Sequence, residues 1–195
     1  MSQRQLIRQQ LRTMRRDLAP DYQLASADQL VSQFTQHPLI CHAKRVALYL
    51  ASDGELDTRP VIEWCWSRDI AVCLPVLHPF SKGHLLFVDF QADTPMSSNR
   101  FGIAEPELNC QTIIVKSAID IVFTPLVAFD AHGNRLGMGG GFYDRTLAGW
   151  HHHRLGPYPI GIAHDCQQID RVPVETWDVP LPEIITPSHR WHWPL

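Results

Sequence analysis

The segment Ile119-Asp-Ile-Val-Phe-Thr-Pro-Leu-Val-Ala-Phe129 is the strongest apolar stretch of the 195-residue sequence. A short run of aliphatic and aromatic residues is typical of a buried strand. Pro125 interrupts the run, because proline has no backbone N–H to donate to a neighbouring strand. We therefore expect a central strand with a kinked exit, directly before the glycine-rich segment 130–144.

Helix-like and strand-like patterns alternate around this segment. Apolar periodicity and helix-start signals predict helices over 4–18, from Leu24 to Phe34, over 59–68 and over 142–149. Short β-branched and aliphatic runs predict strands at Arg45–Ala51, Ile70–Val76, Leu85–Phe90, Ile160–Ala163 and Ile184–Thr186. Residues 91–112 are irregular. The alternation predicts an α/β fold with three layers, in which a mostly parallel sheet carries helices on both faces.

Length and composition limit the class of protein. The length suits one compact domain, so residues 1–195 are expected to form a single domain. A net charge of −3 provides no overall basic field for nucleic acid or an anionic membrane. No apolar run approaches the length of a membrane span, and the N-terminus lacks the apolar core of a secretory signal. The five cysteines are never spaced as CxxC, which favours reduced thiols. We expect a cytoplasmic protein with no nucleic-acid or membrane partner.

The most informative motif is Arg135-Leu-Gly-Met-Gly-Gly-Gly-Phe-Tyr-Asp144, which lies between the expected central strand and a helix. Its glycines let backbone amides approach a ligand without a Cβ in the way. Amides that converge at a helix N-terminus bind phosphate, Arg135 would add a fixed positive charge, and Asp144 could bind magnesium. The motif is neither a Walker A loop nor a GxGxxG turn. Its alternative interpretation is a plain bend with an Arg–Asp pair at the surface.

Ligands of such sheets collect in loops at the carboxyl ends of strands, where this loop and Ser52–Asp57 are both expected. The arginines Arg4, Arg8 and Arg12 recur every four residues and share one face of the first expected helix. They could reach one polyphosphate together. The alternatives are a solvated helix flank, the usual role of such a stripe, or a surface for RNA or anionic lipid.

Other candidate residues have equally simple alternatives. Glu55 and Asp57 could bind the amino-pyrimidine edge of a heterocycle or cap the next helix. Phe101 could stack on a flat ligand or cover the core, and Asp178 is either a second metal ligand or a surface acid. The adjacent histidines His151–His153 point in different directions and make a poor single metal site. The sequence contains no HExxH motif and no GxSxG elbow.

Taken together, these motifs resemble one family, the 5-formyltetrahydrofolate cyclo-ligases, also called 5,10-methenyltetrahydrofolate synthetases. The resemblance covers nearly the whole chain in order: Arg4-Gln-Leu-Ile-Arg8, Gly54-Glu-Leu-Asp-Thr58, Phe101-Gly-Ile-Ala-Glu-Pro106, the Arg135–Asp144 loop, and Val172-Pro173 leading to Asp178. It implies an ATP- and Mg²⁺-dependent closure of 5-formyltetrahydrofolate to 5,10-methenyltetrahydrofolate, with release of ADP and phosphate. In the mechanism that it implies, the formyl oxygen takes the γ-phosphoryl group and N10 attacks the resulting iminophosphate. Phosphoryl transfer asks the protein for positioning and charge neutralisation.

The resemblance also implies roles for particular residues. Those expected at ATP are Arg4, Gln5, Leu6, Ile7, Arg8, Arg135, Leu136, Gly137, Met138, Gly139, Gly140, Gly141, Phe142 and Tyr143. Those expected at the folate are Ser52, Glu55, Asp57, Phe101, Met138, Gly139, Gly140, Gly141, Phe142 and Tyr143. Asp144 and Asp178 match the magnesium positions, and Arg135 and Tyr143 are the expected catalytic residues.

Some positions depart from certain members of the family. Gly140 stands where some carry Lys, and Met138 where some carry Arg, so Arg135 and the metal would neutralise more of the γ-phosphate. Arg4 stands where many have Lys, and Phe142 replaces a frequent Tyr. A sugar-phosphate isomerase or acyl-transferring enzyme on a related scaffold stays an alternative, as does a module that binds RNA or an acidic partner. We expect a monomer.

Overall fold

The computed structural model describes residues 1–193 and gives no description of 194–195. The α-helices are α1 (Gln3–Arg16), α2 (Pro20–Thr35), α3 (Pro38–His42), α4 (Arg59–Ser67) and α5 (Phe142–His153). The strands are β1 (Arg45–Ala47), β2 (Ala71–Leu77), β3 (Leu85–Asp89), β4 (Met96–Ser98), β5 (Ala104–Pro106), β6 (Ile113–Ile114), β7 (Ile121–Pro125), β8 (Ala128–Phe129), β9 (Arg135–Leu136), β10 (Tyr158–Ile162), β11 (Glu183–Ile185) and β12 (Arg190–His192). Short 3₁₀ helices are η1 (Cys110–Thr112), η2 (Lys116–Ala118) and η3 (Asp165–Gln167).

One sheet organises the molecule, with strand order β12-β11-β10-β7-β1-β2-β3-β6. The strands β11, β10, β7, β1 and β2 are mutually parallel. Toward the edges, β12 pairs antiparallel with β11, β3 pairs antiparallel with β2, and the edge strand β6 pairs antiparallel with β3. As predicted from its apolar sequence, β7 lies in the interior of the sheet, between β10 and β1. The mostly parallel sheet is therefore confirmed.

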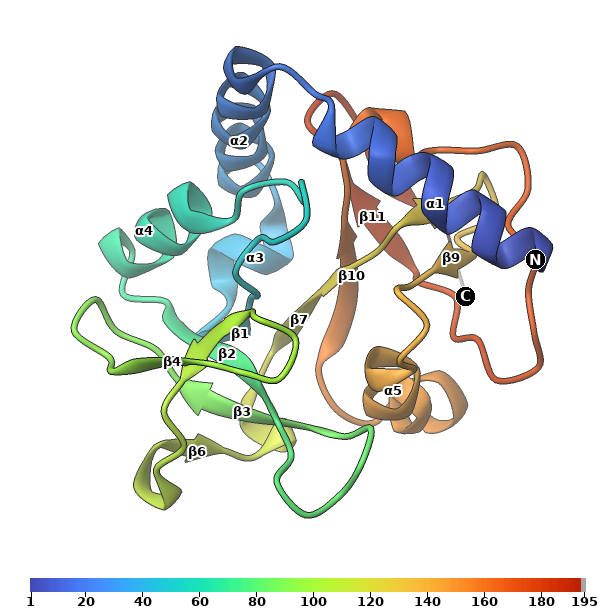
Figure 1. The fold of residues 1–195 in the computed structure, drawn as a ribbon. Helices are drawn as coiled ribbons and strands as arrows, with labels where there is room; N and C mark the ends of the chain where they lie inside the picture. Colours follow the sequence, from blue (N-terminus) through green and yellow to red (C-terminus); the bar gives the residue numbers. More distant parts are fainter. Residues whose placement is uncertain (194–195) are drawn as a thin grey trace.

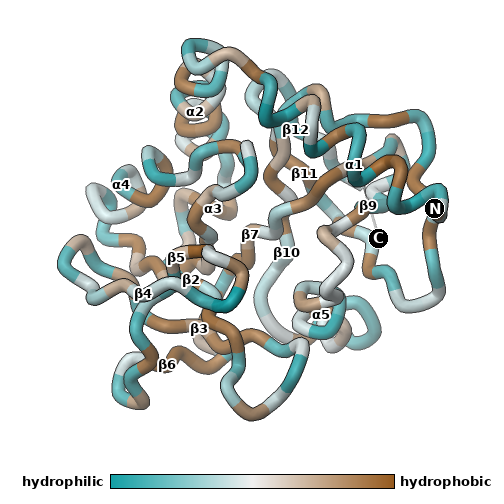
Figure 2. Tube along the Cα trace, viewed as in Figure 1, coloured by the Kyte–Doolittle hydropathy of each residue, from teal (hydrophilic) through white to brown (hydrophobic). Residues whose placement is uncertain are grey.

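The two faces of the sheet are covered by different helices (Figure 1). In β7, Ile121 and Phe123 belong to the core cluster that includes α2, α3 and α4, while Val122 between them belongs to the cluster that includes α5. Side chains alternate between the faces of a strand, so one apolar run supplies both cores. Figure 2 shows hydrophobic residues following the strands and hydrophilic residues gathering on α1 and the outer loops. The expected three-layer α/β arrangement is confirmed.

A few details differ from the sequence prediction. Strand β1 is shorter than the expected Arg45–Ala51, because the chain turns away toward the 52–57 loop. The irregular segment 91–112 contains the small β4–β5 hairpin. Helix α2 begins at Pro20, before the expected start at Leu24, which is 66% exposed, and Leu30 and Phe34 supply its buried face. No helix among residues 1–193 has the length and apolar character needed to cross a membrane.

Helix α1 has a local and a tertiary cause. Its N-cap Ser2 and Gln5 form a reciprocal capping box, which satisfies free amides of the first turn. Ile7 and Leu11 then pack on Val127 and Leu136 in a small third cluster, separate from the two faces of the sheet. The helix therefore lies across the β8–β9 hairpin, at the carboxyl end of β7 (Figure 1).

Candidate functional site

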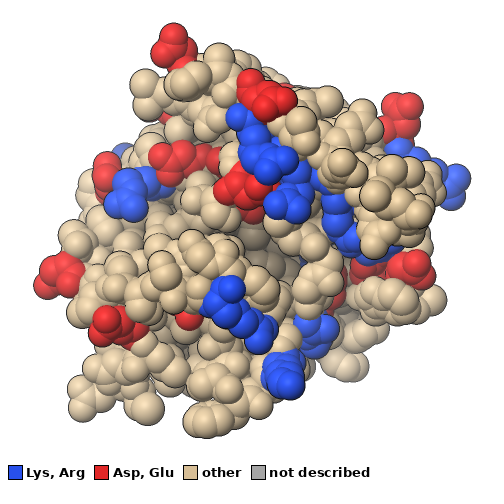
Figure 3. Space-filling view, viewed as in Figure 1, with Lys and Arg blue, Asp and Glu red and all other residues tan. Residues whose placement is uncertain are grey.

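Two loops meet at the carboxyl edge of the sheet. Strands β1 and β7 are parallel neighbours, so the segment 48–58 that follows β1 lies beside the segment 126–141 that follows β7. Helix α1 crosses both segments. Figure 3 shows basic side chains along α1, all of them arginines, which border a hollow at the centre of this face and have acidic side chains beside them.

The glycine loop ends in the first turn of α5. Its residues Gly139 and Gly141 have φ of 100° and 65°, values that glycine adopts without strain. No acceptor among residues 1–193 takes a hydrogen bond from a backbone N–H of residues 137–144. Unpaired amides at the N-terminus of a helix favour an anionic ligand.

Four residues of the segment 137–144 line a cavity of about 350 Å³. Gly139, Gly140 and Gly141 form one wall, and Asp144, Trp177 and Asp178 are also part of its lining. The cavity therefore combines amide donors with two carboxylates and an exposed aromatic ring. The two carboxylates are the expected magnesium ligands, and the structure brings them to the same cavity.

Each of these carboxylates is paired with an arginine. Arg135 donates from Nη2 to Oδ1 of Asp144 at 2.7 Å, and its side chain is only 2% exposed. Arg4 donates to both carboxylate oxygens of Asp178, with 3.0 Å between Nη2 and Oδ1. Burial acts to raise the pKa of Asp178, but the hydrogen bonds from Arg4 and the backbone of Glu175, with the charges of Arg4 and Arg135, together hold that pKa below its ordinary value. The predicted phosphate ligands and the predicted metal ligands thus neutralise one another in pairs.

Two more arginines lie against the glycine loop. Arg8 donates from Nε to the carbonyl of Gly137 at 2.8 Å, and burial lowers its pKa. Arg145 donates to the carbonyls of Gly83 and Gly140, and its guanidinium lies 5.9 Å from the ring centre of Phe142. Arg145 was not predicted as a site residue, although this arginine directly follows Asp144. The sequence did contain a signal for this residue, because a positively charged side chain directly after the glycine motif, in the first turn of a helix, lies close to the expected phosphate site.

The arginines at the C-terminal end of α1 contact a different segment, the loop 52–57. Arg12, Arg15 and Arg16 all lie within ion-pair distance of Asp53, at 2.6, 3.0 and 3.6 Å. The prediction that Arg4, Arg8 and Arg12 share a face is correct, but their guanidinium groups go to separate protein acceptors. In the structure the stripe is neither a solvated flank nor a single cluster of free cations.

Three of the residues expected at the folate, Ser52, Glu55 and Asp57, lie in the segment that follows β1. Glu55 accepts from the backbone N and Oγ of Ser52, and burial raises its pKa. Asp57 accepts from the backbone N of Arg59 at 2.9 Å, the local bond that its capping alternative requires. Tyr143, in the first turn of α5, packs against the core cluster that includes α5, and burial raises its pKa.

The ring of Phe101, 57% exposed, meets that of Phe142 edge to face with 6.3 Å between their centres. The β4–β5 hairpin thus reaches the glycine loop. Leu136 is fully buried, whereas Leu6 and Met138 are exposed. His151 and His152 line the cavity, with 5.1 Å between their ring centres. Residues 1–193 contain no cluster of three or more His, Cys, Asp or Glu side chains arranged to hold a metal.

The fold and the site define an α/β protein with a loop of free amides at the carboxyl edge of its sheet. Residues 1–187 match the model of the 5-formyltetrahydrofolate cyclo-ligase family. The chain is 47% identical over 183 residues to the 5-formyltetrahydrofolate cyclo-ligase of Escherichia coli K12, covering 94% of this chain and all of the relative. It is 48% identical to that of Haemophilus influenzae, over 91% of this chain and 96% of the relative. The chain therefore belongs to the 5-formyltetrahydrofolate cyclo-ligase family.

Solved structures agree with this assignment. The 5,10-methenyltetrahydrofolate synthetase of Aquifex aeolicus superposes with a TM-score of 0.82 at 25% identity, covering 98% of this chain and 93% of that one. The synthetase of Mycoplasma pneumoniae has a TM-score of 0.74 at 24% identity, over 95% and 99% of the two chains, and supports the fold alone. None of these relatives supports a sugar-phosphate isomerase, an acyl-transferring enzyme or an RNA-binding module.

Proposed function

We propose that this chain closes 5-formyltetrahydrofolate to 5,10-methenyltetrahydrofolate with ATP and Mg²⁺, releasing ADP and phosphate. One observation carries the ATP part of the proposal: the run of unpaired amides from residue 137 to 144, which borders a cavity that also contains Asp144 and Asp178. Donors of this kind at a helix N-terminus match the oxygens of a polyphosphate.

The chemistry explains why a nucleotide is needed. A formamide oxygen is a poor leaving group, so ring closure requires its activation. The formyl oxygen attacks the γ-phosphorus, the bond to the β-phosphate oxygen breaks, and ADP leaves. N10 then attacks the formyl carbon, loses its proton, and the C–O bond breaks to release phosphate. Both steps place negative charge near the glycine loop, where amides and guanidinium groups stabilise it.

The paired charges give the site a way to receive Mg²⁺ and ATP together. Magnesium in nucleotide sites is bound by one or two carboxylates plus phosphate oxygens, so Asp144 and Asp178 on one cavity fit this requirement. When bound, the ion neutralises phosphate charge. Arg4 and Arg135 would then exchange their carboxylates for phosphate oxygens, and no buried charge is left unpaired.

The folate would occupy the hollow between the 52–57 segment and the glycine loop. We assign Ser52, Glu55 and Asp57 to its pterin end, with Phe101 and the ring of Phe142 as apolar neighbours. Tyr143 would lie between the two substrates, because it directly follows the glycines of the loop and because the negative charge of Glu55 contributes to its raised pKa. The raised pKa keeps its hydroxyl protonated and able to donate a hydrogen bond.

The test is turnover of the purified chain with ATP, Mg²⁺ and 5-formyltetrahydrofolate, followed by the absorbance of the methenyl product. Product should form only with all three components, and chelation of Mg²⁺ should stop it. Arg135→Ala should lower kcat/KM for ATP by about 10²-fold, as for loss of a charge-stabilising group. Arg171→Ala, an exposed arginine, is the control. Product without ATP, or no product at all, would reject the proposal.

A further inference from the structure

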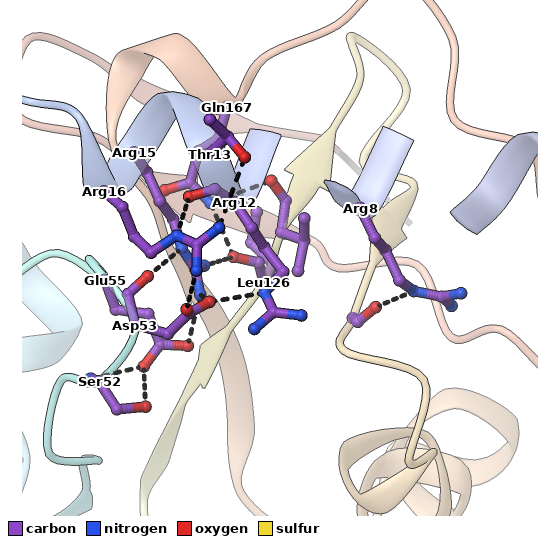
Figure 4. Close-up of polar contacts among 12 residues, drawn as sticks. Arg8, Arg12, Thr13, Arg15, Arg16, Ser52, Asp53, Glu55, Leu126 and Gln167 are labelled. Atoms are coloured by element: carbon purple, nitrogen blue, oxygen red, sulfur yellow. Dashed lines mark hydrogen bonds and ion pairs between the residues drawn. The ribbon is translucent and has the colours of Figure 1, made fainter. Parts of the chain in front are cut away.

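Helix α1 contacts all three segments that carry the proposed site residues. Figure 4 shows the contacts made by Arg8 and by the arginines at the C-terminal end of the helix. Near its start, Arg4 donates to the carbonyl of Pro173 and to Asp178. One turn later, Arg8 donates to Gly137 of the glycine loop. Near its end, Arg15 donates to Asp53. At 1.5 Å per residue, a straight helix places Arg4 and Arg15 about 17 Å apart along its axis.

The contact between Arg15 and Asp53 is buried and has several bonds. The guanidinium of Arg15 is 0% exposed and donates from Nε to the carbonyl of Asp53 at 2.9 Å and from Nη2 to its carboxylate at 3.0 Å. Its Nη1 lies 3.2 Å from the carbonyl of Leu126, at the exit of β7, and its Nη2 lies 3.6 Å from Glu55. One side chain therefore joins α1 to the loops that follow both β1 and β7.

The backbone of the 52–57 segment is fitted closely to α1. A Cβ added to Gly54 would lie 2.9 Å from the carbonyl oxygen of Arg15 and from the backbone of Arg16. Asp53 has a φ of 54°, in the left-handed region that non-glycine residues rarely adopt. The partly exposed Arg12 adds a second ion pair to the same carboxylate at 2.6 Å. This segment cannot shift relative to α1 without breaking these contacts.

We propose that Arg15 and Asp53 are positioning residues that couple the nucleotide site to the folate site. A ligand that draws Arg4 and Arg8 toward the glycine loop acts on the whole helix, and the Arg15–Asp53 contact passes that displacement to the segment carrying Ser52, Glu55 and Asp57. This inference rests on the proposed function, because it needs both sites. Thermodynamic coupling is reciprocal, so each substrate should tighten the binding of the other.

The experiment measures the dissociation constant of 5-formyltetrahydrofolate by calorimetry, with and without Mg²⁺ and the non-hydrolysable analogue AMP-PNP. In the wild type the nucleotide should lower this constant about tenfold, within the usual range for coupled sites. Asp53→Asn removes the charge and keeps a residue that tolerates positive φ. It should reduce the coupling to below about twofold while the constant for AMP-PNP alone changes by less than about twofold.

Asp120→Asn is the matched control. Like Asp53, Asp120 joins two segments: its carboxylate accepts hydrogen bonds from the backbone N–H groups of Lys44 and Arg45, at the amino ends of β1 and β7. Loss of the Asp120 charge should leave the coupling intact. Arg12→Gln, at a partly exposed position, should lower the coupling in part and serves if Asp53→Asn fails to fold.

Two outcomes are separable. If the wild type turns over but its folate affinity is independent of AMP-PNP, or if Asp53→Asn and Arg12→Gln retain full coupling, this inference is wrong and the proposed function stands. If the wild type neither binds the folate nor forms product, the proposed function fails and the inference fails with it.

Discussion

Replacement of Gly139 by alanine separates the backbone geometry of the glycine loop from its proposed chemistry. Gly139 and Gly156 have nearly the same φ, 100° and 101°, in a region that L-residues rarely adopt, so alanine is strained at both positions. A methyl group at 139 would lie 3.5 Å from Cζ of Arg8, which is ordinary contact, and one at 156 would meet no atom within 4 Å. Neither position therefore adds a steric clash to the backbone strain.

The expected cost is about 1–2 kcal/mol for a left-handed L-residue, in both variants. For a chain of this size, that lowers Tm by about 2–8 °C. Only Gly139→Ala should also lower kcat/KM for ATP, by about 10²-fold, because it moves an amide donor and places a methyl group at the cavity wall. Differential scanning calorimetry and initial-rate kinetics measure the two effects. Equal kcat/KM in the two variants would refute the role of the glycine-loop amides.

Three further predictions follow from the site and its surroundings. Asp57→Ala should raise KM for 5-formyltetrahydrofolate about tenfold and KM for ATP much less, and steady-state kinetics that show an effect on ATP alone would contradict its assignment to the folate. Trp177 is 66% exposed and lines the cavity, so AMP-PNP binding should change the tryptophan emission of the wild type, and Trp177→Phe should abolish that change. If the change persists in the variant, the ring of Trp177 lies outside the nucleotide site. Burial lowers the pKa of His164 to about 4, so the unfolded chain binds a proton at this histidine first as the pH falls. The contribution of His164 to the free energy of unfolding is therefore full above pH 6.5 and decreases by at most about 3 kcal/mol down to pH 4. Urea unfolding at pH 7 and pH 5 should show this loss, His164→Gln should reduce it, and His132→Gln, at an exposed position, should leave it unchanged.

The sequence predicted the fold because its signals are local. The apolar run around β7 could only be stabilised inside a sheet, and its alternating side chains supply both cores. Proline and polar segments marked the ends of the helices to within a few residues. The antiparallel edges were not predicted, because the direction of a strand depends on the path of its connection and not on its own residues.

The candidate site was predicted in part. The glycine motif indicated amides free to bind an anion, because glycines before a helix let a ligand approach the backbone, and those amides are unpaired within residues 1–193. The residues Arg145 and Asp53 were missed. Arg145 acquires its position from a contact with Gly83 in the β2–β3 hairpin, and Asp53 acquires its three arginine partners from α1. Such contacts between distant segments leave no periodic signal in the sequence.

The sequence by itself determined the main alternation of helices and strands, the mostly parallel sheet and the spacing of Arg4, Arg8 and Arg12 on one face of a helix. Only the tertiary structure decided what those guanidinium groups contact, because their partners lie on segments up to 174 residues away along the chain. It pairs Arg4 with Asp178, Arg8 with Gly137, and Arg12 with Asp53. A charge is stabilised by whatever lies within a few ångströms of it, and that neighbourhood exists only once the chain has folded.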